Sequence, residues 1–186
     1  GLTLGPSLFN GSSYEETLKV PESGLIVDLP YTRPRHKAIH RKMKRRTSVT
    51  TDLPMGLRGT TRWLRAVSEA AGSWTPDLQR KIMRMEERTR KRVDVMFDRW
   101  RGMRVAIFAD PAHGAGLASL LLDMGIEPAL VGLKGTTMGG KEAFLDCLER
   151  DGNPLPENTA ILENPSIALI QEHLERLLRK GQLDGV

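Results

Sequence analysis

The residues best suited to chemistry lie in two glycine-containing loops, 110–116 and 134–140. The second loop, KGTTMGG, precedes an expected helix, and backbone N–H groups at a helix start can bind an anion. It lacks the Gly-Lys-Ser/Thr ending of a P-loop. The first loop, DPAHGAG, fails the dinucleotide-binding pattern because it has two glycines and no proper third. Taken alone, each loop is a weak signal.

Both loops follow expected strands. Residues 105–109 form an unbroken apolar run, which is typical of a strand covered on both faces, and 129–131 form a second run. Between them, Gly114 and Gly116 open a helix that ends at Gly125. Such a strand-helix-strand unit is right-handed, and its ligands bind beyond the carboxyl ends of the strands. The two loops are therefore the first places to look for function.

The rest of the chain extends this unit into an α/β domain. A third short strand is expected at 159–162, and a fourth begins at 183–186 after another helix. Residues 103–186 therefore predict a Rossmann-like parallel sheet with flanking helices, truncated at its C-terminal end. Residues 48–102 supply a strand and the helices that link to this domain. Residues 1–47 form a poorly defined N-terminal segment with a basic run.

One long connecting helix is expected over 73–102, with Thr75 as its cap and Pro76 in its first turn. Its apolar residues fall on one stripe: Leu78, Ile82, Met85, Val93, Met96, Phe97 and Trp100. We expect the methionines of this stripe to belong to the core. The opposite face carries charges of both signs, which predicts contact with solvent.

Length and composition exclude several classes of protein. The 186 residues suffice for a domain with a real core, and no apolar run approaches the roughly 20 residues of a membrane span. The first residues do not resemble a signal peptide, and both ends suggest a piece of a longer protein. Cys147 is the single cysteine, so this chain alone can build neither a disulfide nor a cysteine cluster for a metal. We expect it to be a small buried core residue in a protein of the reducing cytoplasm.

The basic character of the chain is concentrated in residues 33–46, RPRHKAIHRKMKRR. The chain has 28 basic and 23 acidic residues; without the eight Lys and Arg of this run, 20 basic residues face 23 acidic ones, a balance of −3. The run fits a solvated helix or one that docks an acidic partner. Contact with nucleic acid is disfavoured because no aromatic residues are interleaved for base stacking. His36 and His40 have the spacing of a metal pair but lack a third ligand nearby.

Two segments in this order carry a family resemblance. The first, LPMGLRGTTRWL at 53–64, fits the pattern P-x-G-x-x-x-T-x-x-aromatic-L. The second is the strand-loop-helix-strand that begins at 104–111 and continues to LLDMGIEP at 121–128, and the long helix ending in DRW joins the two. Together they resemble the nitrogenase molybdenum–iron protein family, closest to its beta-type subunits. Relatives include the light-independent protochlorophyllide and chlorophyllide reductases. The resemblance covers residues 48–186.

The resemblance implies part of an ATP-dependent, nitrogenase-like reductase. Such subunits consist of several Rossmann-like domains, pair with a sister subunit as heterotetramers, and receive electrons from an ATP-hydrolysing iron protein through an iron–sulfur cluster. Substrate or a metallocofactor lies in a cleft between domains. By this analogy six residues face the cleft: Asp110, His113, Gly114, Gly135, Thr136 and Thr137. His113 would donate protons, since the ordinary pKa of histidine is near neutrality, and the other five would contact the cofactor.

The resemblance also leaves alternatives open. The cluster-ligating cysteines of the family lie in an N-terminal domain that this sequence does not contain, so this chain alone is expected to hold no cluster and not to be catalytic. A scaffold for metallocofactor assembly would share the fold. A Rossmann-like module without redox chemistry, contacting nucleic acid through residues 33–46, is the alternative from a different class. Dinitrogen, a tetrapyrrole and a small sulfur compound are all open as substrates.

Overall fold

The computed structural model describes residues 3, 5, 11–29, 47–136 and 139–185. The chain divides into two compact units, one of Gly1–Thr51 with Ala66–Trp74 and one of Asp52–Arg65 with Thr75–Val186. The basic run, including its two histidines, and Thr137 lie outside the described residues, so the interpretations that rest on them stay predictions. Across the described part of the chain, no helix combines the length and the apolar character that a membrane crossing requires.

The first unit is built on a pair of short parallel strands. Strand β1 (Leu25–Asp28) pairs with β2 (Thr47–Thr50), and the N–H of Thr51 extends the pairing by donating to the carbonyl of Asp28 at 3.0 Å. Before them come helix α1 (Tyr14–Leu18) and a 3₁₀ turn, Val20–Glu22.

The second unit contains the predicted parallel sheet. Strands β3 (Arg104–Ala109), β4 (Glu127–Leu133) and β5 (Ala160–Glu163) are hydrogen-bonded in that order. On the free side of β3, Val105 forms a parallel bridge with Gly185, where the fourth strand is expected to begin. The resulting order, β5-β4-β3 and then residue 185, is the start of the 3-2-1-4 order of doubly wound folds. The predicted α/β class is therefore confirmed.

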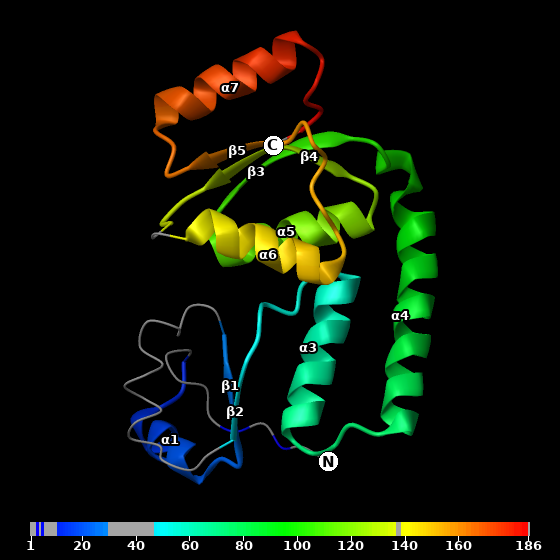
Figure 1. The fold of residues 1–186 in the computed structure, drawn as a ribbon, viewed down its shortest axis with the longest axis vertical. Coiled ribbons are helices and arrows are strands. Elements are labelled where there is room, and N and C mark those ends of the chain that lie inside the picture. Colours follow the sequence, from blue (N-terminus) through cyan, green and yellow to red (C-terminus); the bar gives the residue numbers. More distant parts are fainter. Residues whose placement is uncertain (1–2, 4, 6–10, 30–46, 137–138, 186) are drawn as a thin grey trace. The chain divides into compact units, whose positions relative to one another are not determined.

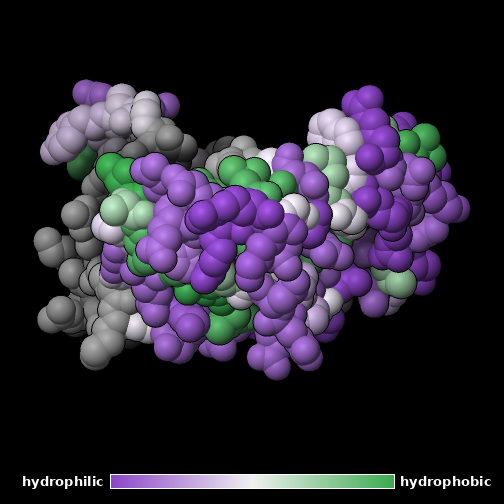
Figure 2. Space-filling model, turned by 90° about the horizontal axis from the view of Figure 1, so that it is seen from above, coloured by the Kyte–Doolittle hydropathy of each residue, from purple (hydrophilic) through white to green (hydrophobic). Residues whose placement is uncertain are grey.

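Helices cover both faces of this sheet (Figure 1). Helices α5 (Pro111–Asp123) and α6 (Gly140–Asp151) lie on one face, and α7 (Ile167–Arg179) lies on the other. Right-handed crossovers require this arrangement, because the connection after β5 returns past β3 in the opposite direction. One core cluster lies on each face. The first is Ile107, Ala115, Ala118, Val131, Leu133, Phe144, Cys147 and Leu148; the second is Ala106, Leu130, Leu177 and Leu183. Seen from above, the surface is mostly hydrophilic, with hydrophobic residues confined to small strips (Figure 2).

Two further helices precede the sheet, α3 (Leu57–Ala70) and α4 (Pro76–Phe97), and a 3₁₀ turn, Asp98–Trp100, follows α4. The hydroxyl of Thr75 caps α4, as the sequence predicts, by accepting the N–H of Leu78. The expectation that the methionines of α4 are core residues is wrong. Met85 and Met96 are 56% and 66% exposed, and Ile82 is the buried residue of α4 among those described. The apolar stripe exists, but only a narrow seam of it is covered.

Candidate functional site

Three loops meet at the carboxyl edge of the β3–β4–β5 sheet. Backbone hydrogen bonds join each loop to the strand beside it. The N–H of Lys134, after β4, donates to the carbonyl of Ala109 at the end of β3, at 2.8 Å. The N–H of Asn164, after β5, donates to the carbonyl of Leu133 at the end of β4, at 2.7 Å. The two loops chosen from the sequence are therefore neighbours, and the segment after β5 joins them.

The first loop presents an acid–imidazole pair. Asp110 caps α5, with one carboxylate oxygen accepting the N–H groups of Ala112 at 3.0 Å and His113 at 3.2 Å. Its other oxygen lies 2.7 Å from Nδ1 of His113. A carboxylate in this position favours the form of the ring that carries a proton on Nδ1, in which Nε2 is the basic atom. Both side chains are partly exposed, so the cap also orients an imidazole at the surface of the edge.

The second loop is held by a side chain that sequence reasoning missed. Asn164 accepts the N–H of Thr136 through its amide oxygen and donates to the carbonyl of Thr136 through its amide nitrogen, both at 3.1 Å. Asn164 has φ 44°, a left-handed conformation that asparagine tolerates better than most residues. The sequence signal that could have identified Asn164 was its position directly after the third parallel strand. It belongs to the site because that edge is where the loops gather.

The glycines of the two loops have different surroundings. Gly114 is buried in α5, where an added Cβ would lie 3.2 Å from Leu133 Cδ2, so the space there is needed for packing. Gly135 is exposed, has φ +67° and has nothing within 4 Å of an added Cβ. At Gly140, at the start of α6, an added Cβ would lie 3.0 Å from Cβ of Thr136, so the space there is taken by the Thr136 side chain. The structure thus gathers Asp110 with His113 and Gly135 with Thr136 at the edge and places Gly114 inside.

The hydroxyl of Thr136 has an unusual environment. Its oxygen is buried and finds no hydrogen-bond partner among the described residues. A buried polar group left in this state costs roughly 1–3 kcal/mol. A polar group brought to this loop by a ligand or a neighbouring segment would remove that cost.

A set of charged residues fixes the opposite ends of the helices that carry the two loops. The carboxylate of Asp123, at the end of α5, accepts the N–H of Leu57 at 2.6 Å and so caps α3 from a distant part of the sequence. In return, the guanidinium of Arg58 donates to the carbonyl of Gly152 and, at 2.9 Å, to Asn153 at the end of α6. Each helix end therefore receives the group its unpaired backbone atoms require.

A buried ion pair lies beside these caps. Nη1 of Arg62 is 2.5 Å from Oδ1 of Asp151, whose side chain is only 2% exposed, and Asp52 accepts from Arg62 at 3.3 Å and from Arg150 at 2.7 Å. Burial raises the pKa of Asp151, and Arg62 opposes that shift. The segment 52–62, which carries the sequence pattern P-x-G-x-x-x-T, thus braces α5 and α6. The sequence offered no signal for pairs so far apart along the chain.

The surroundings of the single cysteine do not favour metal binding. Cys147 lies on the buried face of α6 and belongs to the core, as the sequence predicts, with Nη2 of Arg62 3.7 Å from its sulfur. Burial, and then the carboxylates of Asp52 and Asp151, raise the pKa of the thiol. A thiol kept protonated is a poor ligand because metals bind the thiolate. The described residues also contain no group of three or more His, Cys, Asp or Glu arranged for a metal. The donor set of this described part of the chain therefore does not fit an iron–sulfur cluster.

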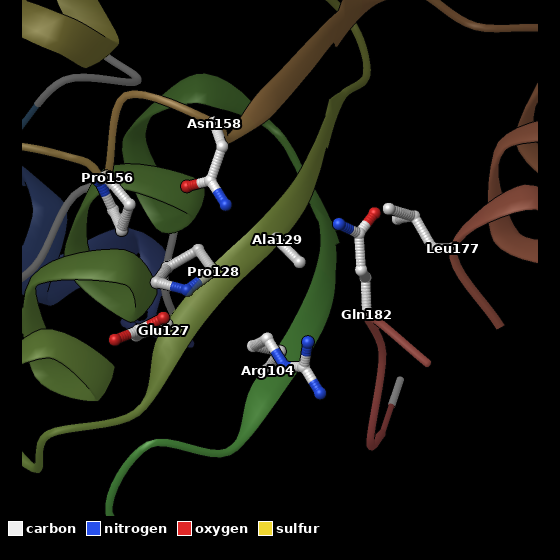
Figure 3. Close-up of a pocket in the computed structure, with 8 residues that line it drawn as sticks. All are labelled: Arg104, Glu127, Pro128, Ala129, Pro156, Asn158, Leu177 and Gln182. Atoms are coloured by element: carbon white, nitrogen blue, oxygen red, sulfur yellow. The ribbon is translucent and has the colours of Figure 1, made fainter. Parts of the chain in front are cut away.

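A small pocket opens at the other, amino edge of the sheet (Figure 3). Arg104 and Glu127, at the starts of β3 and β4, line it together with Asn158 and Gln182. Its volume of about 80 Å³ is far below the roughly 300–1,000 Å³ typical of sites for small molecules. It has room for a few water molecules, so the carboxyl edge remains the candidate site.

Comparisons with known proteins agree on one family. The family model described as nitrogenase component 1 type oxidoreductase matches residues 1–184. The nitrogenase molybdenum-iron protein beta chain of Crocosphaera subtropica is 32% identical over 132 residues, which are 68% of this chain and 24% of that protein. This chain thus spans about a quarter of the length of that relative.

Solved structures show the same fold. The structure titled nitrogenase Cp1 at pH 6.5 has a TM-score of 0.65 at 19% identity and matches 98% of this chain and 43% of its own. The structure titled nitrogenase Cp1 at pH 5 has a TM-score of 0.69 at 12% identity, over 100% of this chain and 45% of its own. At such identities the likeness concerns the fold alone.

Proposed function

The chain belongs to the nitrogenase component 1 type oxidoreductases, and we propose that it forms part of a subunit of a nitrogenase-like, ATP-dependent reductase. In this proposal the carboxyl edge of the β3–β4–β5 sheet forms one wall of a cleft for cofactor or substrate. The observation that carries the proposal is the meeting of three loops there, with an oriented imidazole in one and a clamped glycine loop in the next. Doubly wound folds bind their ligands at this edge.

The role proposed for His113 is to deliver protons. Reduction of an unsaturated bond by two electrons also takes up two protons, so a reductase needs a group that can release them at the substrate. Asp110 holds Nδ1 and thereby sets the orientation of the ring. A positioned acid of this kind contributes about 10²–10⁴-fold in rate. Gly135, Thr136 and Thr137 are proposed to contact the bound group from the neighbouring loop, and Asn164 to keep that loop in place.

The cofactors and partners of the complex are part of the same proposal. An iron–sulfur cluster, and in some relatives a metallocofactor, would supply electrons to the substrate. Since the described residues offer no group of three or more metal ligands, we propose that residues elsewhere in the assembly hold it. A sister subunit and an ATP-hydrolysing iron protein complete the proposed complex, in the cytoplasm. Asp110 and His113 act at the wall of the cleft, and no metal–ligand role is assigned to this chain.

The proposal is tested with His113→Gln in the full-length protein isolated in its native assembly. The rate of reductant consumption is measured with dinitrogen, a tetrapyrrole and small sulfur compounds in turn. We expect a loss of about 100-fold with the reduced substrate and unchanged iron content, because the variant removes a proton donor and no ligand. His173→Gln is the matched control, since that histidine lies on α7 with Nδ1 3.0 Å from the carbonyl of Leu169. Equal rates for the His113 variant and the unaltered protein would refute the assignment.

A further inference from the structure

The charged residues of helix α4 fall into two sets, one with ion-pair partners on the same helix and one without. Only a narrow seam of the helix is shielded from solvent. The side chains of this seam are Leu78, Ile82, Glu86, Val93 and Phe97. On one side of the seam the basic residues have acidic partners: Arg90 pairs with Glu86 at 3.0 Å and Lys91 with Glu87 at 3.5 Å. Their charges are neutralised within the helix. The mixed signs expected from the sequence therefore describe only one side of α4.

The other side carries four basic residues without an acidic partner in the described part of the chain, whereas Asp77 at the start of the same face pairs with Arg80. We call Lys81, Arg84, Arg88 and Arg92 the basic stripe. All four are exposed, and no carboxylate among the described residues pairs with them. Their spacings of three, four and four residues place them on one face of the helix, over about 16 Å at 1.5 Å per residue. The unpaired charge is thus a continuous line rather than a scatter.

Large apolar side chains accompany the basic stripe. Met85 and Met96 lie between it and the buried seam, and Val95, on the stripe side, is 82% exposed. Arginine and methionine are enriched at the centres of protein–protein interfaces, whereas lysine and acidic residues are depleted there. Methionine also adapts to irregular surfaces. This side of α4 has the composition of an interface rather than that of a solvated helix.

We propose that the basic stripe of α4 docks an acidic surface of a partner protein, such as a helix with carboxylates spaced three and four residues apart. Charge complementarity identifies the occupant, since four unpaired cations call for a matching row of anions. Nucleic acid fits less well because Met85, Val95 and Met96 would lie against phosphates without forming favourable contacts. The stripe also has no aromatic side chain for base stacking. A membrane surface fits less well because α4 lacks a broad apolar face opposite its charges.

Site-directed cross-linking in fresh cell extract tests the partner, using the full-length protein. A carbodiimide joins amines to carboxylates in direct contact, so Arg88→Lys and Arg92→Lys introduce reactive amines without changing the charge. We expect both positions to link to Asp or Glu residues in one segment of a different polypeptide, identified by sequencing the joined peptides. Arg80→Lys is the matched control. Because Arg80 pairs with Asp77 on its own helix, its lysine is expected to link there only.

Charge reversal gives a second, independent result. Arg88→Glu with Arg92→Glu is expected to weaken binding of the cross-linked partner about tenfold or more at moderate salt, whereas Arg90→Glu with Lys91→Glu on the paired side leaves it unchanged. Links within the same polypeptide, or none, would overturn the proposal. The proposal would also be overturned if no protein cross-link formed and the stripe variant, Arg88→Glu with Arg92→Glu, lost binding to a labelled DNA duplex. None of these measurements depends on substrate reduction. A negative result would therefore overturn the docking proposal without bearing on the proposed reductase activity.

Discussion

Removing Arg62 is expected to destabilise the second unit in a way that depends on pH. Arg62 is 28% exposed and pairs with Asp151, whose side chain is 2% exposed. Arg62→Met removes the cation and leaves the carboxylate buried. Breaking a buried ion pair from one side costs about 3–5 kcal/mol. We place the loss near the lower end, at about 3 kcal/mol of unfolding free energy, because Arg62 is partly solvated.

The sign of the pH dependence follows from the direction of the shift. Burial raises the pKa of Asp151 in the folded protein, so the folded state binds more protons than the unfolded state in the window between the two pKa values. Stability therefore falls as pH rises through that window. Without Arg62 the folded pKa rises further, so the window extends to higher pH. The variant is expected to recover part of its lost stability as the pH is lowered from 8 towards 5.

Urea denaturation at several pH values measures both effects. The matched control is Arg62→Met combined with Asp151→Leu, which replaces the pair by apolar side chains and is expected to recover most of the loss. The reasoning would be refuted if Arg62→Met lowered the unfolding free energy equally at all pH values. It would also be refuted if the double variant were less stable than the single one.

Three further predictions concern packing, capping and the loop clamp. Gly132→Ala places a Cβ against the ring of Phe108, so we expect a loss of about 2–3 kcal/mol of unfolding free energy in urea denaturation, with partial rescue by Phe108→Leu; wild-type stability would contradict the close approach. Asp123→Ala removes the cap of α3 and is expected to cost about 1 kcal/mol, whereas full stability would show that the cap is dispensable. Asn164→Gly keeps the left-handed backbone but removes the clamp, so hydrogen exchange at the N–H of Thr136 is expected to accelerate; unchanged exchange would show that the clamp does not hold the loop.

The sheet and its helices were predictable because their signals are local. The apolar runs at 105–109 and 129–131 mark buried strands by themselves, and Thr75 before Pro76 marks a helix start without any tertiary information. The two loops followed from the same reasoning, since the end of a parallel strand fixes the edge of the sheet at which its loop lies. Asn164 could have been included on the same ground.

The contacts that hold the site were not predictable because their partners lie far apart in the sequence. Leu57 and Asp123 are 66 residues apart, and neither is distinctive without the other. The exposure of Met85 and Met96 was missed for a related reason. Helical spacing identifies a stripe, but only the neighbouring elements decide how much of that stripe is covered.

We propose that this chain works within a multisubunit reductase whose cluster is held by other residues. Mass measurement of the native assembly, with iron determined on the same sample, tests it most directly. We expect a large complex that contains a second, different polypeptide and several iron atoms, and whose iron content is unchanged by Cys147→Ser. An iron-free monomer or homodimer of the full-length protein would contradict it.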